Sequence, residues 1–228
     1  MNSDAVKAAS AYALPVAVGM FSIGVSYGFM MVAEGFSFWY PFLMAGLIFA
    51  GTMEFITVGL LQGAFDPLNA FILAVLVNSR HLFYGISMLS KYANMGWKKP
   101  LLIFAMCDEA FAINSVVKIP YGVDKGAFML TVTGIIYSFW VSGALVGGLV
   151  GAFIPVDSKG IEFVMTALFV IMFLDVWKNP KNRSAGIVGV VTSILSLLIV
   201  GPVYFLIPSM VLMVVWFLFV KRRKEGAV

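Results

Sequence analysis

The chain consists of apolar segments that are each about as long as a helix crossing a lipid bilayer. Roughly 20 apolar residues in a helix span the hydrocarbon core, and only short polar connections separate such segments here. Charged residues make up 11% of the sequence, whereas soluble domains carry about 25%. We identify the segments as 11–33, 42–63, 67–90, 101–117, 127–151, 161–177, 185–201 and 203–220. The sequence therefore predicts an integral membrane protein.

Helices and closed barrels are the two structures that satisfy every backbone hydrogen bond within lipid. The segments do not alternate between polar and apolar residues as barrel strands do. We therefore predict an all-α polytopic membrane protein with about seven or eight hydrophobic segments, which form a single transmembrane domain over residues 1–228. The net charge of +4 lies in short loops and the tail, where it orients a membrane protein, so it does not indicate nucleic-acid binding.

Three basic clusters indicate the cytoplasmic side: Lys91/Lys98/Lys99, Lys178/Lys181/Arg183 and Lys221–Lys224. Three segments separate the first two clusters, which is inconsistent if each segment crosses once. We therefore expect 101–117 to be re-entrant or broken, with loops 91–99 and 118–125 on one face, the N-terminus outside and the C-terminus inside. In the plainer alternative all eight segments span and one loop disobeys the charge rule.

Small residues recur at four-residue spacing in three segments, as Gly24/Gly28, Gly59/Gly63 and Gly143/Gly147/Gly151. In lipid such patterns let helix backbones approach closely. Glycine is also common in membrane helices, so a single pair can arise without a contact. The triple at 143–151 is the best candidate for a tight interface, internal or with a partner.

Polar side chains interrupt segment 67–90 at Asn78, Arg80 and His81. A charge at the bilayer centre costs roughly 2.5–3.5 kcal/mol on insertion scales, so these residues point to a polar pathway. In a helix Arg80 and Tyr84 form an i, i+4 pair. Arginine binds carboxylates bidentately and histidine titrates near neutral pH, which suits anion binding and proton movement. The alternative is a structural Arg–acid pair beside a core histidine.

Acidic residues lie in the two neighbouring segments, as Asp108-Glu109 in 101–117 and Glu54 in 42–63. Adjacent residues of a helix point about 100° apart, so Asp108 and Glu109 should meet different partners. One could neutralise Arg80, and the other could take protons or an ammonium group. The alternative is a lumen-facing pair at the membrane interface.

Two motifs of common enzymes, HExxH and the P-loop, are absent from the sequence. One histidine and one cysteine also make a zinc site unfavourable. We therefore expect neither an enzyme nor a metal or other cofactor. An intramembrane hydrolase using Asp108 or Glu109 stays as an alternative.

Three motifs resemble the AzlC family. They are Phe49-Ala50-Gly51-Thr52-Met53-Glu54-Phe55, then Asn78-Ser79-Arg80-His81-Leu82-Phe83-Tyr84-Gly85, and Asp108-Glu109-Ala110-Phe111-Ala112. The resemblance covers essentially the whole chain, and the second and third motifs are its specific part. It implies the large subunit of a prokaryotic exporter of branched-chain amino acids, in the plasma membrane.

The resemblance further implies a small hydrophobic partner of the AzlD type and export driven by the proton gradient, as by an antiporter. Substrates would be leucine, isoleucine, valine and, in some members, methionine. It leaves open whether a higher oligomer forms. The chain departs from the family pattern at Glu54, where glutamine is expected in many members, and an added acid bears on ion coupling and on substrate charge.

A zwitterionic amino acid needs a cation for its carboxylate and an acid for its ammonium group. We assign the carboxylate to Arg80, or alternatively to the N-terminus of a broken helix, and the ammonium group to Glu54, Asp108 or Glu109. The expected substrate-binding residues are Arg80, Asn78, Glu54 and Tyr84, and the expected proton pathway contains His81, Asp108 and Glu109. Phe55, Phe83 and Phe111 are expected to line the apolar pocket.

Two other functions remain open at this point. In the first, the chain is a non-transporting scaffold whose partner carries the pathway, and its polar residues pair internally. In the second, less favoured, it is an intramembrane enzyme, which would form product in detergent without any gradient.

Overall fold

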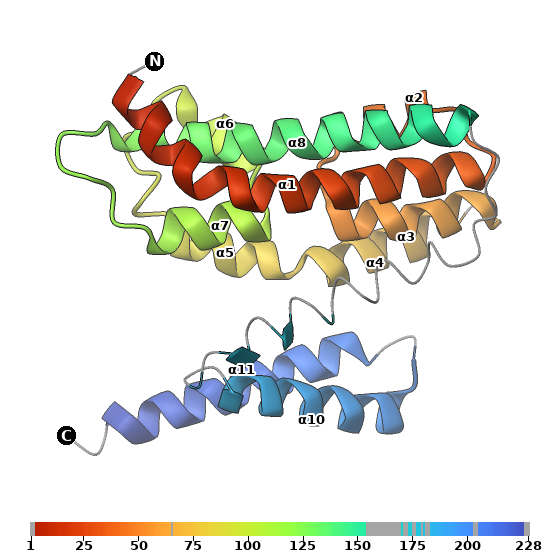
Figure 1. Ribbon diagram of the computed structural model, residues 1–228. Coiled ribbons are helices and arrows are strands. Elements are labelled where there is room, and N and C mark those ends of the chain that lie inside the picture. Colours follow the sequence, from red (N-terminus) through yellow and green to blue (C-terminus); the bar gives the residue numbers. More distant parts are fainter. Residues whose placement is uncertain are drawn as a thin grey trace. The chain divides into compact units, whose positions relative to one another are not determined.

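The computed structural model describes residues 3–64, 66–153, 183–202 and 205–225, with further positions at 170, 173–174, 177–178 and 180. Every regular element in this part of the chain is helical (Figure 1), which confirms the predicted all-α class. The helices are α1 (Ser3–Ala33), α2 (Trp39–Leu47), α3 (Gly51–Gln62), α4 (Pro67–Asn78), α5 (Arg80–Met88), α6 (Lys98–Phe104), α7 (Asp108–Val116), α8 (Lys125–Phe153), α10 (Arg183–Val200) and α11 (Leu206–Glu225).

The chain divides into two compact units, Met1–Val164 and Met165–Val228. The first contains α1 to α8. In the second, α10 and α11 form a helical hairpin, in which Gly189 lies against the sulfur of Met213 and Gly201 makes the turn at φ +84°. Most of the predicted segment 161–177 lies outside the described residues.

Helices α1 and α8 are the long elements of the first unit, and they pack side by side in the same direction. Tyr12 meets Phe128 near their N-terminal ends, and Phe21 meets Phe139 further along. The seam carries small residues because the backbones touch. A Cβ atom on Gly28 would lie 2.1 Å from the Ala144 carbonyl oxygen, and the other close glycines are Gly24, Gly143, Gly147 and Gly151.

Two of the predicted small-residue patterns, Gly24/Gly28 and Gly143/Gly147/Gly151, thus form an internal interface. The third does not form one within the described residues. A Cβ atom on Gly59 would meet nothing within 4 Å, and one on Gly63 would meet only carbonyls of its own helix.

Helices α2 and α3 form a hairpin that enters the unit from one end and returns to the same end. Gly148 of α8 lies against Phe38 at the entrance, and the Tyr137 hydroxyl donates to the Gly46 carbonyl 2.7 Å away near the tip. Helix α3 then runs back until the Gln62 amide donates to Glu34, next to the end of α1. Segment 42–63 is therefore not one continuous helix.

The tip of this hairpin is stabilised by side chains that satisfy its free backbone groups. Phe49 adopts φ +49°, which ends a right-handed helix. The Ala50 amide donates to the Glu54 carboxylate 2.8 Å away. Non-helical backbone at membrane depth requires such internal partners, and here Tyr137 and Glu54 provide them.

Helices α4 and α5 together cross the unit in the direction opposite to α1, with a bend of 46° at their junction. The Ser79 hydroxyl donates to the Leu76 carbonyl at 2.7 Å, and the Asn78 amide donates to the Ala74 carbonyl at 3.0 Å. Side chains that bond back to the preceding turn bend helices. The predicted segment 67–90 is therefore a bent element and not one straight helix.

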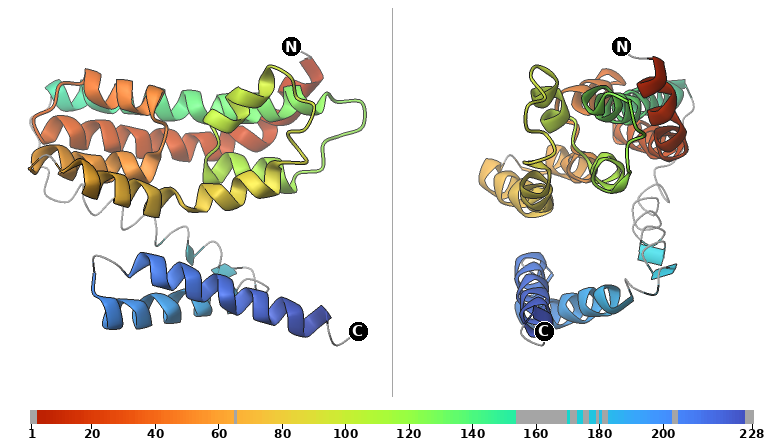
Figure 2. Two further views of the ribbon diagram at one scale, coloured as in Figure 1. Left: turned by 180° about the vertical axis from the view of Figure 1, so that it is seen from behind. Right: turned by 90° about the vertical axis from the view of Figure 1, so that its left-hand side faces the viewer.

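Helices α6 and α7 form a second hairpin, which enters from the opposite end (Figure 2). Lys98 at its entrance makes an ion pair of 2.8 Å with Asp124, just before α8. The chain turns at 105–107, and α7 returns to Lys91, whose ammonium group donates to the carbonyls of Asn114 and Ser115. The predicted break in 101–117 is thus present, and loops 91–99 and 118–125 lie at one end.

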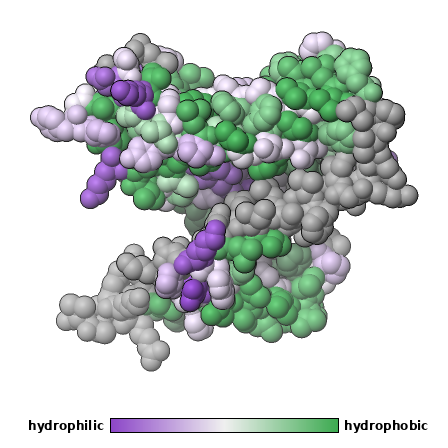
Figure 3. Space-filling view, in the orientation of Figure 1, coloured by the Kyte–Doolittle hydropathy of each residue, from purple (hydrophilic) through white to green (hydrophobic). Residues whose placement is uncertain are grey.

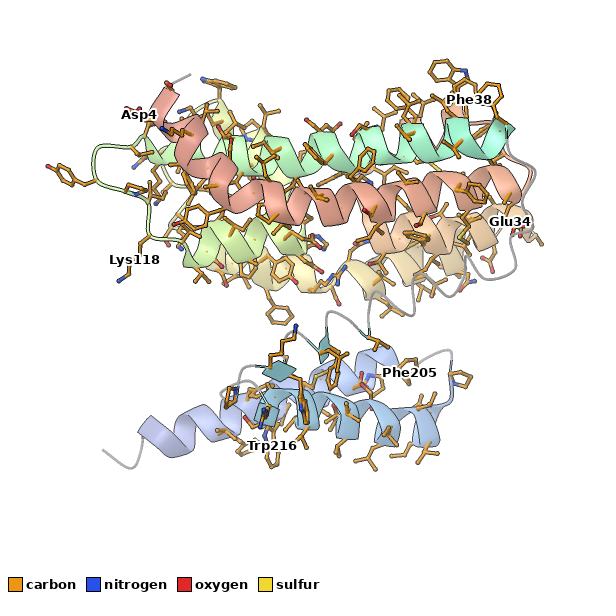
Figure 4. All side chains as sticks on the ribbon, in the orientation of Figure 1. Asp4, Glu34, Phe38, Lys118, Phe205 and Trp216 are labelled. Atoms are coloured by element: carbon orange, nitrogen blue, oxygen red, sulfur yellow. The ribbon has the colours of Figure 1, made fainter. Side chains whose placement is uncertain are left out.

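Figure 4 shows the two ends of the first unit, with Asp4 and Lys118 at one and Glu34 and Phe38 at the other. Helices α1, α8 and α10 are long and apolar enough to cross a membrane, and the bent pair α4–α5 would make a fourth span. The predicted total of seven or eight segments stays a prediction. Apolar residues cover much of the visible surface of the first unit, and strongly hydrophilic ones gather at the end that holds Asp4 (Figure 3).

Candidate functional site

Three interruptions of helical structure meet inside the first unit: the tips of the two hairpins and the bend between α4 and α5. Arg80 lies at the bend and reaches both tips. Its Nη1 atom is 2.7 Å from the Asp108 carboxylate at the start of α7. Its Nη2 atom donates to the Thr52 hydroxyl, 3.2 Å away at the start of α3. The guanidinium thus links three elements that are far apart in sequence.

The Arg80–Asp108 pair is partly accessible and incompletely satisfied. The two side chains are 33% and 20% exposed. Within the described part of the chain, the buried atoms Arg80 Nε and Asp108 Oδ1 have no hydrogen-bond partner. Buried polar atoms are nearly always bonded to protein or water, so these two atoms leave one donor and one acceptor of the ion pair unsatisfied.

An aromatic wall borders this ion pair. The Tyr84 ring stacks on Phe111 at 4.2 Å between centroids, and His81 meets the edge of Tyr84 at 5.5 Å. Tyr84 is also close enough to Asp108 and Arg80 to interact with both charges. Of the three predicted pocket phenylalanines, only Phe111 is in this wall. Phe55 is buried against Tyr27, and Phe83 is 49% exposed.

Glu54 is fully buried and does not contact Arg80 through any described hydrogen bond or ion pair. One of its oxygens accepts from the Ala50 amide, as described above, and the other accepts from the Trp140 indole of α8 at 3.4 Å. The carboxylate therefore joins the tip of the first hairpin to α8. Glu54 lies two residues after Thr52 in α3, and its partners differ from those of the Arg80 site.

The remaining predicted residues occupy different positions around the site. His81 Nδ1 lies 3.2 Å from the Asn78 carbonyl, so it satisfies the backbone at the bend. The Asn78 side chain bonds within its own helix, as noted above. Glu109 follows Asp108 in the first turn of α7, where acids complement the positive end of the helix dipole. No group of three His, Cys, Asp or Glu side chains that could bind a metal occurs among the described residues.

Sequence reasoning missed three residues that organise the site: Thr52, Trp140 and Tyr137. Thr52 and Tyr137 are ordinary residues of membrane helices, so their types give no signal. Trp140 lies in the middle of 127–151, away from the interfaces where tryptophan usually gathers. That position could have indicated a buried polar partner, which the structure identifies as Glu54.

Comparison with known proteins places this geometry in a family. The model of the AzlC protein family matches residues 15–154, which is more than half of the chain and contains every residue of the site. The chain belongs to the AzlC family. The branched-chain amino acid transport protein AzlC of Bacillus subtilis is 45% identical over 206 residues, which cover 90% of this chain and 81% of that protein.

Two further AzlC-like relatives are membrane proteins. One from Haemophilus influenzae is 41% identical over 92% of this chain and 86% of its own length. The inner membrane protein YgaZ of Escherichia coli is 23% identical over 79% of this chain and 78% of its own. No solved structure matches the chain. The AzlC-family chain is therefore a membrane protein of a branched-chain amino acid transport family, consistent with the prediction that it is not an enzyme.

Proposed function

We propose that this chain is the large subunit of a two-component secondary exporter in the plasma membrane of a prokaryote. Its substrates are leucine, isoleucine and valine, with methionine as a related hydrophobic amino acid. Protons move in the opposite direction, and a small AzlD-type membrane subunit completes the exporter. Membership of the AzlC family and the transport function named for the Bacillus subtilis relative support this substrate class.

The observation that carries the proposal is the incompletely satisfied pair of Arg80 and Asp108. An amino acid carries its carboxylate and its ammonium group on one carbon atom, so a cation and an acid that lie side by side suit both groups. The free Nε atom of Arg80 can donate to the substrate carboxylate, and the free Oδ1 atom of Asp108 can accept from its ammonium group. The stacked rings of Tyr84 and Phe111 offer an apolar surface for the aliphatic side chain.

The helix N-termini at the two hairpin tips support the same assignment. Helix α3 begins at Gly51 and α7 begins at Asp108, so the positive ends of both dipoles are near Arg80. Broken helices that direct their N-termini at an anionic substrate group recur in transporters. The substrate carboxylate would therefore meet Arg80 in an electropositive setting.

Proton antiport follows if substrate and proton compete for one carboxylate. While the site is empty, Asp108 is neutralised by Arg80. When a substrate carboxylate binds Arg80 in place of Asp108, the Asp108 carboxylate loses its partner. It must then bind either the ammonium group or a proton, because an unpaired buried carboxylate is strongly unfavourable. Asp108 thus exchanges one cation for the other, and His81 and Glu109 relay protons to it.

The scaffold alternative draws support from the same ion pair, because internal pairing of Arg80 is what a purely structural role requires. The two roles differ in the effect of neutral substitutions. A structural pair contributes to folding alone, so a variant that folds should keep full transport in the complex. A transport site loses activity in a folded protein.

Counterflow of radiolabelled leucine in proteoliposomes tests the proposal, because counterflow needs no gradient. Wild type, Arg80→Ala and Asp108→Asn are compared, each with the small partner. We expect wild-type counterflow and its loss in both variants. Arg183→Lys serves as the control, because Arg183 bonds to the Trp177 carbonyl in the second unit. Full counterflow in folded Arg80→Ala and Asp108→Asn proteins would refute the site.

A further inference from the structure

The two hairpin tips carry the same sequence. Leu-Ile-Phe-Ala occurs at 47–50 and again at 102–105, and a glutamate follows the alanine four residues later in both copies, as Glu54 and Glu109. The first arm of each hairpin also starts with tryptophan and proline, as Trp39/Pro41 and Trp97/Pro100. Both copies lie near the tips: the first covers the end of α2 and the turn before α3, and the second covers the end of α6 and the start of the turn before α7.

The elements around the tips repeat as well, in opposite orientation. Helix α1 precedes the first hairpin and the bent pair α4–α5 precedes the second, and the two run in opposite directions across the unit. The hairpins enter from opposite ends, as the contacts of Phe38 with Gly148 and of Lys98 with Asp124 require. A span followed by a re-entrant hairpin thus occurs twice with inverted topology, an arrangement that is frequent in transporters.

Both tips contact one residue in the middle of α8. The ring of Tyr137 lies 5.0 Å from Phe49 and 6.3 Å from Phe104 between centroids. Phe49 and Phe104 are equivalent positions of the repeat. Tyr137 therefore lies where the two halves meet.

The two copies differ in how deeply their tips are buried. In the first tip, Phe49 is 6% exposed, and Glu54 is buried and bonded to Trp140. In the second tip, Phe104 is 48% exposed and Glu109 is partly exposed. Two related sequences thus occupy one more buried and one less buried position in the same structure. Exchange of these positions between the halves would produce a second state that opens to the other end.

We propose that the two hairpins are gates related by an inverted repeat, α2–α3 for one membrane face and α6–α7 for the other. Tyr137 is the positioning residue against which both tips close. The inference rests on the proposed transport function, because gates serve a pathway. It assigns equivalent positions to Glu54 and Glu109, each near the tip of the hairpin that gates one membrane face.

Cysteine accessibility tests the gates without knowledge of the substrate. In a Cys107→Ser background, which removes the chain's single cysteine, Ala50→Cys and Ala105→Cys each place one thiol at equivalent tip positions. Ser37→Cys and Tyr121→Cys mark the exposed entrances of the first and second hairpins. A membrane-impermeant methanethiosulfonate is applied to either face of oriented vesicles that contain the full chain and its partner.

In the present conformation the pathway opens toward the α6–α7 end, so we expect both Ala50→Cys and Ala105→Cys to react from the face that labels Tyr121→Cys. Because a minor conformation is populated at roughly 10% or less, reaction of either tip from the face that labels Ser37→Cys should be about tenfold slower. Equal reaction of a tip from both faces, or reaction of neither tip while both entrances label, would overturn the proposal.

Tyr137 variants test its positioning role with the same readout. Tyr137→Ala should let both tips react from both faces, whereas Tyr137→Phe, which keeps the ring, should preserve the sidedness. Unchanged sidedness in Tyr137→Ala would overturn the role of this residue. Addition of leucine separates the two proposals. One-sided labelling of the tips that leucine does not alter supports the gates and counts against the proposed substrate.

Discussion

Arg80 shows how a single side chain can define a site that no short motif contains. Its guanidinium bonds to one residue from each hairpin, and both bonds depend on the planar geometry of the group. A lysine at this position has one ammonium group, which cannot hold the Asp108 carboxylate and the Thr52 hydroxyl in the same geometry while also binding the proposed substrate carboxylate.

We therefore expect Arg80→Lys to reduce leucine counterflow by roughly tenfold or more, corresponding to about 1.4 kcal/mol or more of lost interaction. Folding should be preserved, because the positive charge still neutralises Asp108. The measurement is initial counterflow rate in proteoliposomes, with protein folding checked by its elution as a single species in detergent. Arg183→Lys, an identical change outside the site, should leave the rate unchanged. Equal rates in both variants would contradict the role of Arg80.

The Asp124 carboxyl lies outside the membrane-spanning helices, and it predicts how the stability of the protein depends on pH. The hydrogen bond from Lys98, followed by that from the Ala127 amide, holds the pKa of the Asp124 carboxyl below its usual range. A carboxyl whose pKa is lower in the folded state contributes stability above its unfolded pKa. That contribution is lost as the pH falls through the folded pKa. The side chain is 53% exposed, so solvent screening keeps the contribution small.

We expect Asp124→Asn to lower the free energy of unfolding in detergent by at most about 1 kcal/mol at neutral pH. The difference from wild type should shrink below about pH 4, where the carboxyl in the unfolded chain becomes protonated. Thermal unfolding of both proteins across this pH range measures it. A difference that grows as the pH falls would contradict the assigned sign.

At the scale of helices, the seam between α1 and α8 should be sensitive to any added side chain. A Cβ atom on Gly147 would lie 2.0 Å from the Val25 carbonyl oxygen, so the two backbones would have to separate. Gly134 is in the same helix, and a Cβ atom there would meet nothing within 4 Å. The two glycines form a matched pair of test positions.

We expect Gly147→Ala to destabilise the protein by about 1–3 kcal/mol, as overpacking does in well-packed interiors. Gly134→Ala should be neutral or stabilising by up to about 1 kcal/mol, because alanine favours the helix. Thermal unfolding in detergent compares the two variants. Similar unfolding temperatures would show that the seam is not the tight contact described here.

Some of these elements could be predicted because local sequence determines them, whereas others are determined by tertiary contacts. The helices at 11–33 and 127–151 follow from local hydrophobicity and are close to α1 and α8. The break in 101–117 followed from the charge pattern of its flanking loops. The turn at Phe49 and Ala50 could not be predicted in this way, because the residues are apolar and their backbone partners, Tyr137 and Glu54, are set by tertiary packing.

The candidate site was predicted in part for the same reason. Unfavourable polar residues in lipid need partners, which correctly linked Arg80 to an acid of 101–117. The sequence could not decide whether Asp108 or Glu109 pairs with Arg80. The answer depends on the direction in which each side chain leaves α7, and this helix begins only at Asp108. The repeated Leu-Ile-Phe-Ala was present in the sequence, but its meaning depends on the opposed hairpins that the structure reveals.

At the scale of the whole molecule, the proposed small partner should be needed for activity. We expect leucine counterflow only when the chain is purified with an AzlD-type subunit, and a complex of both proteins in native mass spectrometry. The control is the chain purified alone and reconstituted at equal density. Full counterflow by the chain alone would contradict the two-component assignment, although the Arg80 site could still stand.

The contacts of Arg80 also bear on what a cell would lose while the proposed exporter is idle. Movement of one hairpin tip away from Arg80 breaks one bond to its guanidinium. Movement of both tips breaks the bonds to Asp108 and Thr52 together. That doubly open state would be a continuous aqueous path through which protons dissipate the membrane potential without moving an amino acid. Under the proposed mechanism the shared guanidinium disfavours this arrangement, so one arginine would limit the energy that the resting protein dissipates.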